Sequence, residues 1–169
     1  MSDIAYYEPL PEEELRLSIV ENTAKLADIY RTRKGHFYVY GWTGTGKSII
    51  SRRLAKYLMG DYFNYELLSL SQWKSRLGGI FRQLLESDKK VIILDGFIPH
   101  CAGSEFHDFL VKLSEKDIQL FIFTQYPPFD DYPIAYMKNN LDINVFTNVI
   151  KLHFADDDRR LPVVLHQVK

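Results

Sequence analysis

Apolar residues along the chain follow two alternating patterns, short continuous runs and longer stretches with helical spacing. Continuous runs predict buried strands, whereas apolar residues that recur every three or four positions predict amphipathic helices. The continuous runs predict strands at residues 36–40, 65–70, 91–95, 118–124 and 149–154. Helical spacing predicts helices near residues 12–31, 49–58, 71–85 and 104–113, with short helices at 134–141 and after Asp156 or Asp157.

The alternation of strands and helices determines the expected fold class. Strands separated by helices pair in parallel, and the helices then cover both faces of the sheet. We therefore expect an α/β fold with a five-stranded parallel sheet in a three-layer αβα arrangement. The length fits a single domain over residues 1–169, and residues 1–11 look irregular because Pro9 and Pro11 flank Leu10.

Composition adds few constraints to this picture. Hydrophobic residues make up 46% of the chain and charged residues 25%, which are ordinary values for a globular protein. The net charge of −1 gives no global nucleic-acid signature, so any DNA contact has to come from local patches. Cys101 is the only cysteine, which excludes an internal disulfide. The start lacks a signal-peptide pattern and no apolar run reaches membrane-spanning length, so we expect a cytoplasmic protein without a membrane contact.

The most specific motif follows the first predicted strand and opens a predicted helix. Residues 41–48 fit G-x-x-x-x-G-K-[ST], the pattern of the phosphate-binding P-loop; the alternative is a glycine-rich turn without a ligand. Gly44 and Gly46 would let backbone N–H groups surround phosphate oxygens at the positive end of the helix. Lys47 would reach the β- and γ-phosphates, and the Ser48 hydroxyl would bind Mg²⁺. The predicted nucleotide-binding residues are Gly41, Trp42, Thr43, Gly44, Thr45, Gly46, Lys47, Ser48 and Ile49.

Two further candidates stand at strand ends, where ligands bind in parallel α/β sheets. Asp95 ends an apolar strand, as does the Walker B acid that holds Mg²⁺ through water, although a carboxylate here can also simply begin a turn. Thr124 ends the next strand and could orient water beside the γ-phosphate; alternatively, Thr124 and Gln125 are a polar pair that starts a loop. We predict Lys47, Asp95 and Thr124 as catalytic residues, and Ser48 and Asp95 as metal-site residues.

These motifs predict a P-loop NTPase core that binds ATP or ADP with Mg²⁺, and at this point the chain resembles a known family. It is similar to the AAA+ ATPases, within the branch of the bacterial replication initiator DnaA and its short homologue Hda. The resemblance spans residues 12–166 and rests on residues 38–48, 68–73, 91–95, 97–106, 121–128 and 149–161. It implies a nucleotide-dependent regulator or loader in DNA replication that acts through a protein partner, either a replication protein or a second copy of itself.

The departures from that family concern hydrolysis. Gly96 follows Asp95, where the family usually has an acid that activates the attacking water; Glu105 and Asp108 are near in sequence but are expected to face solvent. Residues 136–142 contain no arginine, where the family usually presents an arginine finger. The chain also ends at Lys169, before a complete helical lid. We therefore expect a candidate ATPase with an incomplete catalytic set, and weak activity when it is alone.

Three other functions fit parts of the pattern. A superfamily 3 helicase domain of a small replicon or virus shares the P-loop and the Walker B strand, although Asn commonly stands where this chain has Thr124. A small-molecule kinase would need an arginine-bearing lid, and no arginine occurs between Gly103 and Lys138. A pseudo-ATPase, which binds nucleotide for stability alone, is compatible with Gly96.

Overall fold

A β-sheet with strand order β2-β3-β4-β1-β5-β6 forms the centre of the protein. It is seen in a computed structural model that describes residues 11–42, 44–98, 103–128, 142–158 and 162–169. The elements, with η for a short 3₁₀ helix, are α1 (Pro11–Thr32), β1 (His36–Gly41), α2 (Lys47–Tyr57), β2 (Asp61–Asn64), η2 (Tyr65–Leu67), α3 (Leu70–Glu86), β3 (Val91–Asp95), α4 (Ser104–Glu115), β4 (Gln119–Thr124), η4 (Ile143–Val145), β5 (Phe146–Phe154) and β6 (Val163–Gln167). The predicted α/β class is therefore confirmed.

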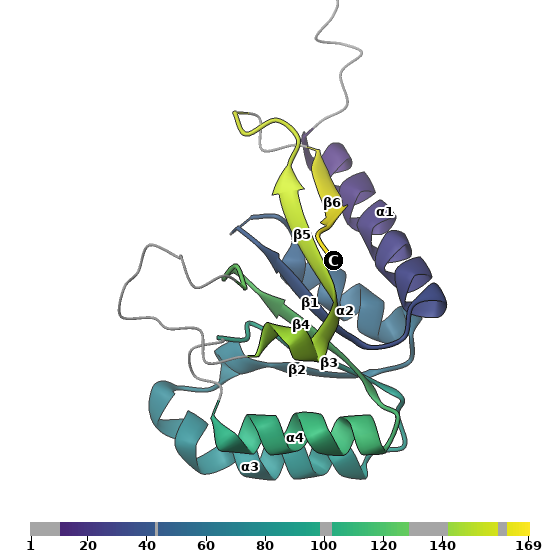
Figure 1. Cartoon of the computed structure of the whole chain (residues 1–169). Helices are drawn as coiled ribbons and strands as arrows, with labels where there is room; N and C mark the ends of the chain where they lie inside the picture. The colour runs from purple at the N-terminus through teal and green to yellow at the C-terminus, as the bar shows by residue number, and fades with distance from the viewer. Residues whose placement is uncertain (1–10, 43, 99–102, 129–141, 159–161) are drawn as a thin grey trace, which may run out of the picture.

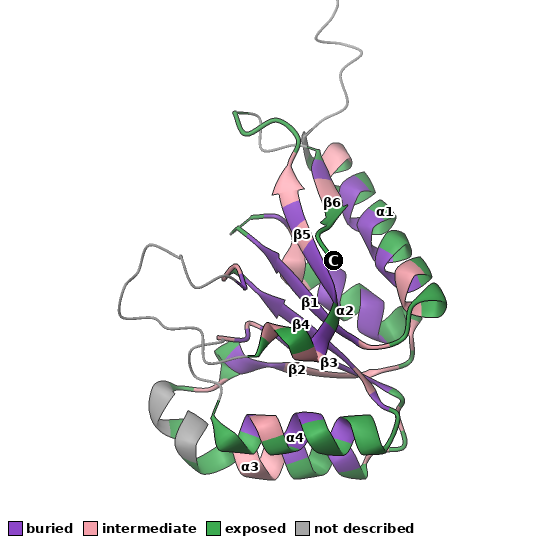
Figure 2. Cartoon of the chain, viewed as in Figure 1, coloured by how far each residue is buried: buried purple, intermediate pink, exposed green. Residues whose placement is uncertain are grey.

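Helices cover both faces of the sheet, with α1 and α2 on one side and α3 and α4 on the other (Figure 1). Alternate residues of each central strand enter two separate hydrophobic clusters. In β3, Ile92 and Leu94 pack with the α3 and α4 side, whereas Val91 and Ile93 pack with the α1 and α2 side. Burial on both faces explains why the central strands read as continuous apolar runs, and Figure 2 shows them buried along their length.

The prediction of a five-stranded, fully parallel sheet is wrong at one edge. A sixth strand, β6, pairs antiparallel with β5. The connection between them is short, and the Ala155 N–H donates to the Pro162 carbonyl at 2.9 Å, so the chain can only return in the opposite direction. Of the helix predicted after Asp156 or Asp157, the described residues up to 158 show none, and residues 159–161 lie outside the described part of the chain. Asp156 Oδ1 instead accepts from the Asp158 N–H at 3.1 Å and forms a turn.

The second predicted strand, at residues 65–70, is misplaced. The strand is β2, which ends at Asn64, and the Asn64 side chain accepts from the Glu66 N–H at 2.9 Å. This bond favours the 3₁₀ helix η2 over a further strand. Ser69 and Gln72 then form a capping box that begins α3, which continues through two glycines. The helix predicted at 134–141 lies outside the described residues.

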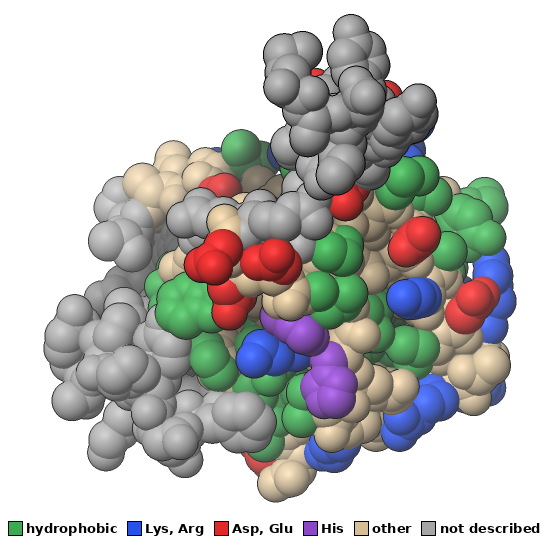
Figure 3. Space-filling model, turned by 90° about the horizontal axis from the view of Figure 1, so that it is seen from above, with side chains coloured by type: hydrophobic (Ala, Val, Ile, Leu, Met, Phe, Trp, Pro, Cys, Tyr) green, Lys and Arg blue, Asp and Glu red, His purple; other side chains and the backbone are tan. Residues whose placement is uncertain are grey.

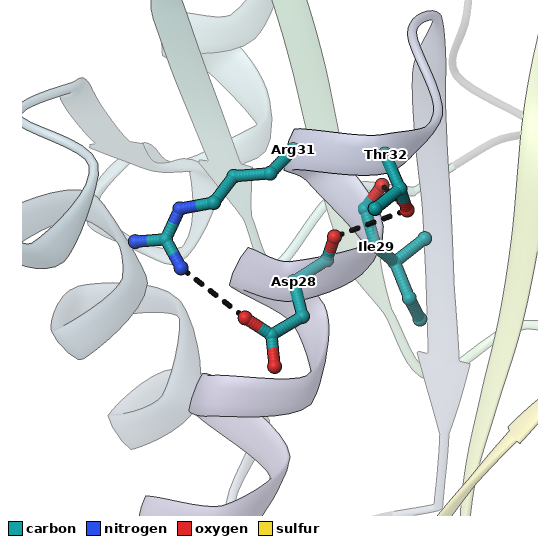
Figure 4. A network of polar contacts seen from close by, with 4 residues as sticks. All are labelled: Asp28, Ile29, Arg31 and Thr32. Atoms are coloured by element: carbon teal, nitrogen blue, oxygen red, sulfur yellow. Dashed lines mark hydrogen bonds and ion pairs between the residues drawn. The ribbon is translucent and has the colours of Figure 1, made fainter.

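Helix α1 ends close to its predicted end and holds the edge strand. In its last turn, the Thr32 hydroxyl donates to the Asp28 carbonyl at 3.1 Å, and Arg31 pairs with the Asp28 carboxylate at 3.2 Å (Figure 4). In the middle of the helix, Asn22 Nδ2 donates to the Val163 carbonyl at 3.0 Å. Because Asn22 is buried, this bond fixes β6 against α1.

His36, the first residue of β1, connects that strand to β4 and α4. Its Nδ1 accepts from the Leu120 N–H at 3.1 Å, so this nitrogen carries no proton. Its Nε2 lies 3.3 Å from the Ser114 hydroxyl oxygen and donates to it, because that hydroxyl donates to the Leu110 carbonyl. Burial lowers the pKa of His36 below its ordinary value of 6.5.

Protonation of His36 is therefore expected to destabilise the fold. The unfolded chain takes up the proton near pH 6.5, whereas the folded protein resists it. The contribution of His36 to the free energy of unfolding is fully present above that pH. It is lost as the pH falls from there through the lowered pKa of the folded state. Urea unfolding between about pH 8 and about pH 5 should show this loss, and His36→Gln should flatten the profile. The exposed control His166→Gln should keep the original profile, and an unchanged slope in His36→Gln would contradict the assignment.

Candidate functional site

A cavity of about 370 Å³ lies at the carboxyl ends of β3 and β4, beside the start of α2. Parallel pairing brings these ends to one edge of the sheet, although they lie far apart in the sequence. The predicted site residues that border the cavity are Gly44, Gly46, Lys47, Ser48, Ile49, Asp95 and Thr124. The structure thus brings together the glycine-rich loop and both strand-end residues that the sequence singled out.

The other predicted loop residues do not border the cavity. Gly41 ends β1 and is buried, as is the Thr45 side chain, whose hydroxyl donates to the Trp42 carbonyl at 2.8 Å. The Trp42 side chain is 63% exposed, so it faces solvent more than the cavity. Thr43 lies outside the described residues. These residues shape the loop, whereas its second half provides the cavity wall.

Two glycines of the loop have the backbone conformation predicted for them. Gly44 has a φ of +87° and Gly46 a φ of +80°, in the region that disfavours residues with a side chain. Gly46 is also the N-cap of α2, where it offers no side chain to cap the helix. The N-cap side chain thus satisfies none of the first N–H groups of α2, and the helix dipole favours an anion at this place.

Lys47 is the cation of the cavity. Its Nζ donates to the Trp42 carbonyl at 2.7 Å and lies 3.5 Å from the Thr45 hydroxyl oxygen. Burial lowers the pKa of Lys47, while the nearby carboxylates of Asp95 and Glu66 oppose that shift. A half-buried ammonium beside uncapped helix N–H groups is suited to bind a multiply charged anion.

Asp95 is held rigidly at the end of β3. Only 3% of the residue is exposed. One carboxylate oxygen accepts from the Tyr62 hydroxyl at 2.7 Å, and the other accepts from the Gly96 N–H at 2.9 Å. Burial and this carboxylate both raise the pKa of Tyr62. The alternative that Asp95 simply begins a turn does not explain its place in the cavity wall, although its Gly96 bond does shape the turn.

Thr124 lies between the loop and Asp95 because β4 is inserted between β1 and β3. The residue is 1% exposed, and its Oγ1 accepts from the Tyr126 N–H at 3.2 Å. The hydroxyl therefore stabilises the turn after β4, as the loop-starting alternative requires, and it keeps its own proton to donate. Gln125 also borders the cavity. A catalytic role for Thr124 stays a prediction.

Among the residues of the site that sequence reasoning missed are Tyr62 and Glu66. Tyr62 supports Asp95, and Glu66 borders the cavity. Both were missed because the second strand was placed at 65–70 instead of Asp61–Asn64, so that neither residue was recognised near a strand end. The available signal was Gly60, a helix-stop residue directly before β2. The predicted exposure of Glu105 and Asp108 on α4 is confirmed.

The side chains that border the cavity suit a metal cation that is held mainly by a bound anion. Within the described part of the chain, no group of three or more His, Cys, Asp and Glu side chains could hold a metal ion by itself. Ser48 and Asp95 nevertheless border one cavity, where they could complete the coordination of a magnesium ion carried by phosphate oxygens. The residues present therefore fit Mg²⁺ with a nucleotide better than Mg²⁺ alone.

The surface gives few signs of a particular partner. On the face in Figure 3, a group of acidic side chains lies beside histidine side chains, and the other described acidic and basic side chains are scattered. The exposed basic residues Arg52, Arg53 and Lys56 lie on α2. Among the described helices, none has the length and apolar character needed to cross a membrane.

Comparison with known proteins adds no relative to this description. Neither a protein-family model nor a curated protein matches the chain.

The bond from Tyr62 to Asp95 is expected to stabilise the fold. Tyr62→Phe leaves one oxygen of a buried carboxylate without its donor, so the free energy of unfolding should fall by about 2 kcal/mol. Urea unfolding measures the change. Tyr57→Phe, at a residue that is 57% exposed, is the matched control and should change stability by less than about 0.5 kcal/mol. Equal effects of the two substitutions would show that the bond contributes nothing.

Proposed function

We propose that the protein binds ATP or ADP with Mg²⁺ in this cavity and acts as a nucleotide-dependent regulator or loader in DNA replication. The observation that carries nucleotide binding is the convergence of the loop, Asp95 and Thr124 on one cavity that also holds Lys47. Its volume of about 370 Å³ is within the usual range for small-molecule sites. On its own, the chain would be a weak ATPase.

Different cavity residues would bind the phosphate oxygens and the metal ion of a triphosphate. Backbone N–H groups at Gly46 and the start of α2 would donate hydrogen bonds to the phosphate oxygens, and Lys47 would neutralise part of their charge. Ser48 and Asp95 would hold Mg²⁺, directly and through water, and the ion would neutralise the remaining phosphate charge. Thr124 would donate its hydroxyl proton to a water or a phosphate oxygen.

A regulatory role is supported by the coupling of Lys47 to the loop surface. Lys47 Nζ donates to the carbonyl of Trp42, whose side chain is 63% exposed. A phosphate that draws the ammonium away would break this bond and free the loop at Trp42 to move. Such a change could signal nucleotide binding to a protein partner. The assignment to replication, to a replication protein or to self-association is supported by the resemblance to the AAA+ initiator branch.

Lys47→Ala is expected to abolish nucleotide binding. The substitution removes the cation while it leaves the loop glycines and α2 in place. Isothermal calorimetry with Mg-ATP and Mg-ADP should detect binding to the unmodified protein and none to Lys47→Ala. Lys56→Ala, at an exposed position of the same helix, is the control and should bind as the unmodified protein does. Absence of binding to the unmodified protein would end the proposal.

Nucleotide binding is also expected to change the environment of Trp42. The chain contains 2 tryptophans, so Trp73→Phe leaves Trp42 as the only indole fluorophore. Titration of this variant with Mg-ATP should shift the emission maximum with the dissociation constant found by calorimetry. A double variant with Lys47→Ala should show no shift. Binding without any emission change would contradict the coupling between Lys47 and the loop surface.

A further inference from the structure

The chain that follows β2 brings a second carboxylate to the cavity. Glu66 lies in η2, two residues after the end of β2, and it borders the cavity together with Asp95 and Gly96. It is an exposed residue, so water can reach its carboxylate. Within the described residues, the structure records no hydrogen bond or ion pair of that carboxylate, which leaves it able to accept a proton.

Gly96 and Glu66 share one small space. A Cβ atom at position 96 would lie 2.8 Å from Glu66 Cγ and 3.1 Å from Asn64 Oδ1. Gly96 also has a φ of +67°, which disfavours any residue with a side chain. The place where an acid after Asp95 would begin is therefore filled by the side chain of Glu66. A side chain at position 96 would collide with Glu66, so the packing at this place accommodates an acid at position 66 and none at position 96.

Asn64 fixes the position from which Glu66 extends. Its Oδ1 accepts from the Glu66 N–H at 2.9 Å, and the residue is 7% exposed. Asn64 is the register partner of Asp95 in the pairing of β2 with β3. Glu66 is thus held at a set distance along the sheet edge from Asp95, by main-chain pairing and one turn bond.

The Glu66 carboxylate borders the same cavity as the loop cation and is near enough for its charge to act on that cation. Both Asp95 and Glu66 act on Lys47, where each opposes the larger effect of burial on the pKa of that ammonium. A γ-phosphate bound to Lys47 would therefore have the carboxylates of Asp95 and Glu66 close by. Both oxygens of Asp95 already accept a hydrogen bond, from Tyr62 and Gly96, and Asp95 is buried, whereas Glu66 is exposed and is therefore the carboxylate that a water molecule reaches more easily.

We propose that Glu66 is the catalytic residue that activates water for ATP hydrolysis, in place of the acid that is missing after Asp95. The inference rests on the nucleotide site proposed above. The water oxygen attacks the γ-phosphorus and forms the new P–O bond, while the bond from that phosphorus to the bridging oxygen breaks. The bridging oxygen leaves on ADP. Glu66 takes the proton that the water loses and returns it to solvent, so the products are ADP and inorganic phosphate.

The other acids considered for this role lie elsewhere. Glu105 and Asp108 are on α4, and neither borders the cavity. The Glu105 carboxylate approaches α3 instead, because a Cβ at Gly78 would lie 3.4 Å from Glu105 Oε2. Weak activity of the isolated chain remains the expectation, since a general base does not supply the positive charge that an arginine finger gives to the transition state.

Glu66→Gln tests the proposal, because it keeps the size of the side chain and removes its capacity to take up a proton. The matched control is Glu105→Gln. Binding of Mg-ATP is measured by calorimetry, and ADP formation is measured in single turnovers with protein in excess over ATP. We expect Glu66→Gln to bind Mg-ATP with an unchanged dissociation constant. Its rate of ATP hydrolysis should be lower than that of the unmodified protein by about 100-fold or more. Glu105→Gln should match the unmodified protein in both measurements.

The two measurements separate failure of this inference from failure of the nucleotide site. If the unmodified protein does not bind Mg-ATP, the proposed function itself is wrong. If it binds but forms no ADP, or if Glu66→Gln forms ADP at the unmodified rate, the catalytic role of Glu66 is overturned while the nucleotide site stands. Loss of Mg-ATP binding in Glu66→Gln, with an unchanged urea midpoint, would also overturn it and would make Glu66 a ligand of the nucleotide or its metal.

Discussion

Parallel main-chain pairing is the interaction on which the rest of the structure depends. β1 pairs in parallel with β4 and β5, and β4 pairs in parallel with β3. Parallel strands require long crossover connections, which are helices between several of these strands, and helices cover both faces of the sheet. The same pairing directs the carboxyl end of each of these strands to one edge. Residues as distant in the chain as Lys47 and Thr124 meet there because of the ladder, without any direct bond between them.

In the cavity, the charge of one half-buried cation is opposed by nearby carboxylates. Burial of the Lys47 ammonium disfavours its charge, and the carboxylates of Asp95 and Glu66 oppose that effect. Asp95 is in turn satisfied by the Tyr62 hydroxyl and the Gly96 N–H, so no bond to Lys47 is needed to keep it buried. Lys47 instead bonds a loop carbonyl, which an anion can replace. The site is therefore arranged for capture of a multiply charged anion.

The Glu66 carboxylate gives the cavity a second acid that the sequence around Asp95 lacks. Judged from the sequence, Gly96 suggests that the chain binds nucleotide without the means to hydrolyse it. In the fold, the neighbouring strand brings Glu66 across the space above Gly96, where a longer residue would collide with it. A carboxylate that follows one strand can thus border the same cavity as a residue that ends the next strand, because adjacent strand ends are neighbours in space.

The sequence by itself determined the α/β class, the loop with its left-handed glycines, and Asp95 at the end of a buried strand. These are local properties, since backbone permissiveness and continuous apolar runs act within a few residues. It placed β2 too late and missed β6, because the Asn64 turn bond and the return of the chain beside β5 depend on contacts that no local pattern contains. Only the tertiary structure decided that Tyr62 supports Asp95 and that Glu66 reaches the cavity. Both facts follow from the register of β2 on β3, which is set by packing between segments about 30 residues apart.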